Sequence, residues 1–126
     1  MAVRRMNTLV VEVADLAAST RFYRDGLGLD LHTGADNDAQ GDRWISGDHS
    51  ALSWRDGAFL HFSLYQAKSE VTRHAQIGFS CDDIAASHAR MVHFGAAVIH
   101  GPRKEPWGLT ARYSDPDGNV VSLTEQ

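Results

Sequence analysis

The chain has 126 residues, 43% of them hydrophobic and 22% charged, and a formal net charge of −4, which is the composition of a soluble globular protein with a single domain spanning 1–126. The acidic balance disfavours nucleic acid and anionic membranes as partners. The apolar run after the basic start MAVRRM is too short for a signal peptide or a membrane-spanning helix, so we expect neither.

The first expected elements are a strand and a helix. Residues 8–14 read TLVVEVA, and their alternating apolar side chains are typical of a strand with one buried face. Asp15 follows at a position where its carboxylate can cap a helix. An apolar stripe from Leu16 to Leu27 predicts that helix, and Gly26 ends it.

The remainder of the first half predicts a loop and at least one further strand. Residues 33–42 read TGADNDAQGD, and this composition predicts a mobile loop, either a lid over a binding site or a solvated connection. Asp-Gly at 56–57 is a turn signal. The alternating residues that follow it, to Leu64, predict a strand.

The second half repeats this order. DIAAS at 83–87 echoes DLAAS at 15–19 after 68 residues. A strand pattern at 76–82 precedes the echo, Gly95 ends the second helix, and DGNVVSL at 117–123 again places Asp-Gly before a strand. Each half therefore predicts a strand, a helix and about three further strands, as expected of a duplicated unit.

Cys81 is the single cysteine, so the chain cannot form an internal disulfide. Its place in the alternation of the second-half strand predicts a buried packing residue rather than a nucleophile. A lone thiol suits a reducing compartment, and we expect the protein to be cytoplasmic.

Three segments carry a family resemblance: VADLAASTRFYRDGLGLDL, GFSCDDIAASHARMVHFGA and PWGLTARYSDPDGNVVSL. They resemble the superfamily of glyoxalase I, bleomycin-resistance proteins and extradiol dioxygenases, the vicinal oxygen chelate fold. PWG before DPDGN is most similar to the bleomycin-resistance branch. The resemblance implies an α+β fold of two tandem βαβββ modules, about 6–66 and 73–126. It also implies a curled mixed sheet around a cleft, helices on the outer face, and a homodimer with its clefts at the subunit boundary.

The resemblance also implies where metal ligands would lie in metal-dependent members. Aligned on the repeat and on the Asp-Gly turns, these positions are Thr8, His61, Gln76 and Ser122. Neutral hydroxyls are weak ligands, so we expect no metal cofactor. The alternative is a rebuilt site for a divalent metal such as zinc, nickel or iron, formed by Glu12, His61, His74 and Gln76.

Side chains on the strand faces away from the core are expected to line the cleft. Trp107 would anchor a flat ligand, and Glu12 would meet a cationic group. Tyr113 instead belongs to the core in a second interpretation. The candidate ligand-binding residues are Trp107, Glu12, His61, Gln76, Tyr65, Trp44, Tyr113 and Ser122.

Three functions remain open at this point. The favoured one is a metal-free protein of the bleomycin-resistance type that sequesters a small aromatic or cationic ligand, as in antibiotic resistance. The second is a metal-dependent lyase, isomerase or dioxygenase of the same superfamily. The third is a metal-free enzyme with His61 as the general base and Glu12 as an acid or electrostatic partner. Turnover would separate binding from catalysis.

Overall fold

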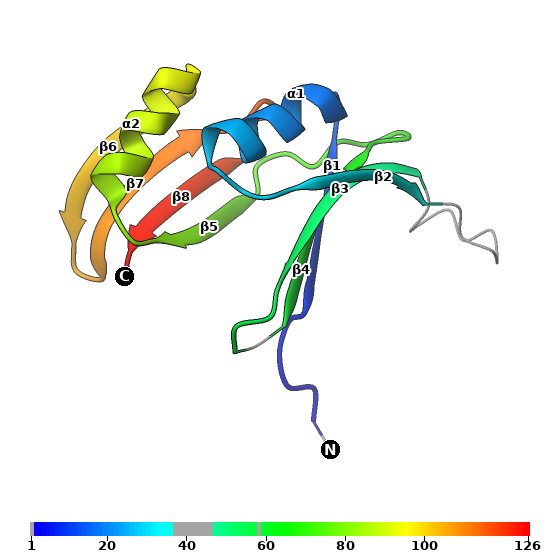
Figure 1. The fold of residues 1–126 in the computed structure, drawn as a ribbon, viewed down its shortest axis with the longest axis horizontal. Coiled ribbons are helices and arrows are strands. Elements are labelled where there is room, and N and C mark those ends of the chain that lie inside the picture. The colour runs from blue at the N-terminus through cyan, green and yellow to red at the C-terminus, as the bar shows by residue number, and fades with distance from the viewer. Residues whose placement is uncertain (1, 37–46, 58) are drawn as a thin grey trace.

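The computed structural model describes residues 2–36, 47–57 and 59–126, and within them the chain forms two βαβββ units (Figure 1). The α+β fold that the family resemblance implies is thereby confirmed, and each half has the strand and helix order that the repeat predicts. The first unit consists of β1 (Thr8–Val13), α1 (Leu16–Arg21), the π-helical turn η1 (Phe22–Gly26), β2 (His32–Asp36), β3 (Gly47–Trp54) and β4 (Leu60–Gln66). The second unit consists of β5 (Gln76–Cys81), α2 (Ile84–Phe94), β6 (Ala97–Glu105), β7 (Gly108–Ser114) and β8 (Val120–Glu125).

Each unit builds its own four-stranded mixed sheet. The N-terminal sheet has the order β1-β4-β3-β2, and the C-terminal sheet has the order β5-β8-β7-β6. β1 runs parallel to β4 and β5 runs parallel to β8, whereas the other neighbours are antiparallel. The two sheets do not close on each other, and both helices lie on the same side of them (Figure 1). In the two strand orders given above, β1 and β5 are edge strands.

The aspartate that opens each echoed segment caps a helix, as the sequence predicts. The Oδ1 atom of Asp15 accepts a hydrogen bond from the backbone N–H of Ala18 at 3.2 Å, and Oδ1 of Asp83 accepts one from Ala86 at 3.1 Å. Each bond satisfies an N–H group that the first helical turn leaves without a partner. Gly95 closes α2 with a φ of 92°, a conformation that glycine adopts without steric cost.

The core lies between the helices and the two sheets. The predicted alternation holds in both first strands, because Val11 and Val13 of β1 and Ile77 of β5 are buried. Phe62 of β4 meets Phe79 of β5 edge to face, with ring centroids 5.7 Å apart. This contact joins the N-terminal sheet to the C-terminal sheet.

The DPDGN turn has a larger role than the simple turn that its sequence indicates. Asp115 is buried, and its Oδ2 accepts hydrogen bonds from the Tyr23 hydroxyl at 2.7 Å and from Asn119 Nδ2 at 2.9 Å. The Asn119 side chain also accepts from the N–H of Ala75 and donates to the carbonyl of Thr72. The turn thus connects η1, the segment before β5 and the start of β8.

The predicted loop at 33–42 is in part a strand, because β2 extends to Asp36 and pairs with β3. The rest of that loop, and Trp44, lie outside the described residues. None of the helices in the described residues is long and apolar enough to span a membrane.

Candidate functional site

Each sheet has one face covered by the helices and one face that turns away from them, which we call the open face. On β1, Val11 and Val13 point to the core, so Thr8, Val10 and Glu12 lie on the open face. Val10 is 45% exposed, which agrees with that placement. The open faces are therefore the surfaces on which the sequence places most of the candidate residues.

The open face of the N-terminal sheet carries Glu12, His61 and Tyr65. His61 pairs with Thr8 on one side and with Ser53 on the other, and its Nδ1 lies 2.7 Å from the Ser53 hydroxyl. Glu12 pairs instead with Tyr65, four residues further along β4. Four residues of strand span about 13 Å, so Glu12 and His61 are too far apart to exchange a proton.

The open face of the C-terminal sheet carries Gln76 and Ser122. Gln76 pairs with Val120, and Ser122 pairs with Gly78. His74 precedes β5 as an exposed residue with a positive φ of 62°. The alternative metal set is therefore divided between the two sheets. No three His, Cys, Asp or Glu residues within the described ranges are placed to hold a metal ion.

The strand registers change one expected equivalence between the halves. Thr8 pairs with His61 whereas Gln76 pairs with Val120, so His61 corresponds to Val120. By the same registers, Ser63 corresponds to Ser122. Alignment on the Asp-Gly turns was therefore wrong by two residues. The chain takes two residues more to reach the paired strand position after the first Asp-Gly turn than after the second.

The corrected positions that resemble metal-ligand sites carry three hydroxyls and one amide: Thr8, Ser63, Gln76 and Ser122. None of these side chains offers a negative charge or an imidazole. Such neutral oxygen donors do not fit a zinc, nickel or iron ion. The Ser63 hydroxyl is also buried and has no hydrogen-bond partner among the described residues.

The aromatic candidates lie in different places. Tyr113 faces the helices, is fully buried, and its hydroxyl lies 2.7 Å from His88 Nδ1. Burial raises the pKa of Tyr113 to about 12. It fills the core, in line with the second interpretation of this residue. Trp107 is 61% exposed in the turn between β6 and β7.

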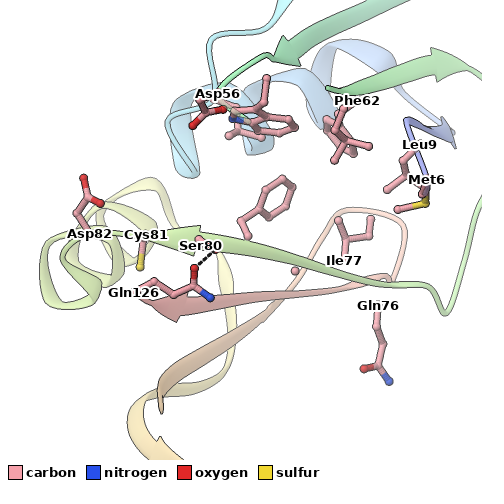
Figure 2. Close-up of a pocket in the computed structure, with 15 residues that line it drawn as sticks. Met6, Leu9, Asp56, Phe62, Gln76, Ile77, Ser80, Cys81, Asp82 and Gln126 are labelled. Atoms are coloured by element: carbon pink, nitrogen blue, oxygen red, sulfur yellow. Dashed lines mark hydrogen bonds between the residues drawn. The ribbon is translucent and has the colours of Figure 1, made fainter. Parts of the chain in front are cut away.

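A cavity of about 610 Å³ lies between the two sheets, on the core side of the N-terminal sheet and around the free edge of β5 (Figure 2). Rings of Trp54, Phe62 and Phe79 line it, with centroids 5.7 to 6.4 Å apart. Figure 2 shows Asp56 and Asp82 at the same end of the cavity. The lining residues are Met6, Leu9, Leu29, Trp54, Asp56, Leu60, Phe62, Gln76, Ile77, Gly78, Phe79, Ser80, Cys81, Asp82 and Gln126.

The charges of this cavity are of one sign. Asp56 and Asp82 are both exposed, and among the described lining residues there is no Lys, Arg or His. Burial raises the pKa of the Cys81 thiol, so Cys81 is a neutral thiol rather than a reactive thiolate. The cavity thus combines an aromatic wall with two carboxylates at one end.

Of the residues predicted to bind a ligand, Gln76 lies on the open face at the free edge of β5 and also lines this cavity. Glu12, His61, Tyr65 and Ser122 lie on open faces and do not line it. From the sequence, Trp54 could either reach the cleft or fill the core, and neither Trp54 nor Asp82 is among the candidate ligand-binding residues. A signal was present, because Asp56 and Asp82 each follow shortly after an aromatic strand residue. The two segments are far apart in the sequence, and only the packing of the two sheets brings them together.

Residues 5–123 match the family model described as Glyoxalase/Bleomycin resistance protein/Dioxygenase superfamily. TnmS3, an antibiotic binding protein from Streptomyces sp. CB03234, is 28% identical, with a TM-score of 0.75 over 99% of this chain and 98% of its own. A glyoxalase/bleomycin resistance protein from the same organism is also 28% identical, with a TM-score of 0.69 over 95% of this chain and 99% of its own.

A superfamily member from Sphaerobacter thermophilus DSM 20745 is 22% identical, with a TM-score of 0.69 over 98% of both chains, and shares the fold. No curated protein shows a significant match to the chain. The family model and these structures confirm the resemblance that the three sequence segments carry.

Proposed function

The chain belongs to the glyoxalase/bleomycin resistance protein/dioxygenase superfamily, and on that premise we propose that it binds and sequesters a small aromatic or cationic molecule without a metal. The observation that carries the proposal is the aromatic cavity with its acidic end. The antibiotic-binding relative, at 28% identity over nearly the whole chain, supports binding rather than catalysis.

The cavity suits a flat ligand with a positive charge. Trp54, Phe62 and Phe79 present ring surface at low conformational cost, and aromatic faces also attract cations. A cationic group at the other end of the ligand would lie near Asp56 and Asp82. A volume of about 610 Å³ falls in the range of small-molecule sites.

We further propose that the protein is a homodimer and that its partner copy encloses the ligand. β1 and β5 are sheet edges, and an unpaired edge invites a further strand. Met6 is 65% exposed and Val10 is 45% exposed beside the β1 edge, so contact there would bury apolar surface. We also propose that the exposed Trp107 contacts the ligand at the subunit boundary.

A calorimetric titration tests the binding function. The probes are proflavine, a flat aromatic cation, and acridone, a neutral ring system of similar size. We expect Asp56→Asn and Asp82→Asn to weaken proflavine binding in a salt-dependent manner and to leave acridone unaffected. Glu70→Gln is the matched control, because Glu70 is exposed and lies outside the cavity lining.

Two outcomes would contradict the proposal. Chemical conversion of a bound compound by the purified protein would show an enzyme instead of a sequestering protein. Equal weakening of proflavine binding by Glu70→Gln and by the two cavity variants would show that only the overall negative charge attracts the cation.

A further inference from the structure

Arg112 lies half-buried on the open face of the C-terminal sheet, and the described residues give it no counter-ion. It stands on β7 between Ser122 of β8 and His100 of β6 in the strand register. Among the residues that the structure describes, its guanidinium forms neither a hydrogen bond nor an ion pair. Partial burial of an unpaired cation costs free energy, which an anion from outside would offset.

Two polar atoms close to Arg112 are also buried without a partner. They are Thr110 Oγ1 and His100 Nε2. Thr110 is 1% exposed and shares the open face with Arg112, two residues away on β7. Nδ1 of His100 lies 2.8 Å from the carbonyl oxygen of Gly101, so Nε2 is the ring nitrogen for which the described residues supply no partner. Buried polar atoms in folded proteins nearly always have a partner, and the described residues supply none here.

The carboxylates of this sheet do not neutralise Arg112. Glu105 is paired with Arg103 at 2.7 Å. Glu125 alternates with Thr124 on β8, so it lies on the helix-covered face, and it pairs with Cys81. Within the described part of β5 to β8, the charge of Arg112 therefore remains uncompensated.

We propose that Arg112 binds an oxyanion, the chemistry shared by carboxylates and by sulfate or phosphate groups. A guanidinium offers two parallel N–H donors that match such a group. The hydroxyl of Ser122 is a second donor. It lies 3.1 Å from the place where a Gly78 side chain would begin, so the missing side chain at Gly78 lets this hydroxyl lie close to the backbone of β5. Thr110 Oγ1, which the described residues leave without a partner, is a third donor.

This site is separate from the cation-attracting end of the cavity and goes beyond the proposed function. Arg112, Thr110 and His100 are not cavity-lining residues, whereas Gly78 borders both places. A ligand in the cavity can thus extend an anionic substituent across Gly78 toward Arg112. The site also takes a free oxyanion, so it can be tested without knowledge of the natural ligand.

Sulfate and acetate are the probes, each titrated by calorimetry against the full chain. We expect saturable sulfate binding at millimolar concentrations and a loss of roughly tenfold or more in Arg112→Gln. Arg24→Gln is the matched control, because it removes the same charge from a residue of η1, outside this sheet, that already has a carboxylate partner. Stronger binding of acetate than of sulfate assigns the site to a carboxylate, and the reverse order assigns it to a tetrahedral anion.

Equal losses in Arg112→Gln and Arg24→Gln would overturn the proposal, and so would the absence of saturable binding of either probe. If Arg112→Gln does not fold, Arg112→Lys replaces it. That variant keeps the charge but loses the paired donors, so we expect weaker sulfate binding from it as well.

Thr110→Val separates a ligand-binding role from a structural one. It removes the hydroxyl and keeps the shape of the side chain. Because that hydroxyl has no partner among the described residues, we expect the variant to melt at a higher temperature than wild type and to bind sulfate several-fold more weakly. A lower melting temperature with unchanged sulfate binding would show that Thr110 serves the fold alone.

Discussion

Tyr23→Phe tests whether the buried polar turn holds the two halves of the chain together. The Tyr23 hydroxyl donates a 2.7 Å hydrogen bond to Oδ2 of Asp115, and both residues are buried. The substitution deletes that donor and changes little else in the shape of the core. Asp115 keeps its bond from Asn119 Nδ2, so the carboxylate is left partly unsatisfied rather than bare.

A hydrogen bond to a charged acceptor contributes about 1.5–3 kcal/mol to stability. For a domain of this size, that loss lowers the melting temperature by roughly 5–15 °C. Tyr113→Phe is the matched control. Its hydroxyl is also in the core, but its partner is the His88 imidazole at 2.7 Å, so we expect a smaller loss of about 0.5–1.5 kcal/mol.

The pH dependence gives a second readout. Burial, and then the negative charge of Asp115, raise the pKa of Tyr23 well above its ordinary value. The unfolded chain ionises this phenol near its ordinary pKa of about 10, whereas the folded chain keeps it protonated. The stabilisation is therefore complete below about pH 10 and is lost as the pH rises above it. Tyr23→Phe should show a shallower alkaline loss.

Urea unfolding at neutral pH and at alkaline pH, followed by circular dichroism, measures both effects. The reasoning fails if Tyr23→Phe costs no more free energy of unfolding than Tyr113→Phe. It also fails if the alkaline loss of stability is the same in Tyr23→Phe as in wild type.

Three further predictions concern the site and the assembly. Purified protein should contain no stoichiometric zinc, nickel or iron, because Thr8, Ser63 and Ser122 offer neutral hydroxyls; about one metal ion per chain by elemental analysis, lost in His61→Ala, would contradict this. Light scattering should give twice the 13.8 kDa of one chain, and a monomer mass throughout the micromolar range would refute the homodimer. Trp107→Ala should weaken the binding of a flat cation by about 1–3 kcal/mol, and an unchanged affinity would remove Trp107 from the site.

Most of the fold was predictable because its signals are local. Alternation fixed which side chains of β1 and β5 face the core, since adjacent strand residues point to opposite faces. Asp15 and Asp83 predicted where the two helices begin, because a capping side chain bonds only to the backbone of the next helical turn. The π-helical turn at Phe22–Gly26 had no such signal. It packs against α2, where Gly26 lies close to Met91, and that contact belongs to the tertiary structure.

The candidate site was predictable only in part, because it depends on register and on the distance between the sheets. Alternation puts Glu12 and His61 on one face, but the pairing of Glu12 with Tyr65 separates them. Periodicity alone also leaves open which face of β7 is covered, and the structure places Tyr113 under α2. The cavity depends on where the ends of β3 and β5 meet across the core, which no local pattern encodes.

The two sheets share one topology, yet their open faces differ in charge. The N-terminal face carries Glu12, whereas the C-terminal face carries the uncompensated Arg112. The four positions that resemble metal-ligand sites, Thr8, Ser63, Gln76 and Ser122, are neutral. A set of carboxylates there would repel one another in the absence of a metal, whereas hydroxyls and an amide carry no such penalty and can still bond to an organic ligand. Neutral donors at these four positions therefore suit hydrogen bonding to an organic ligand better than the coordination of a metal ion.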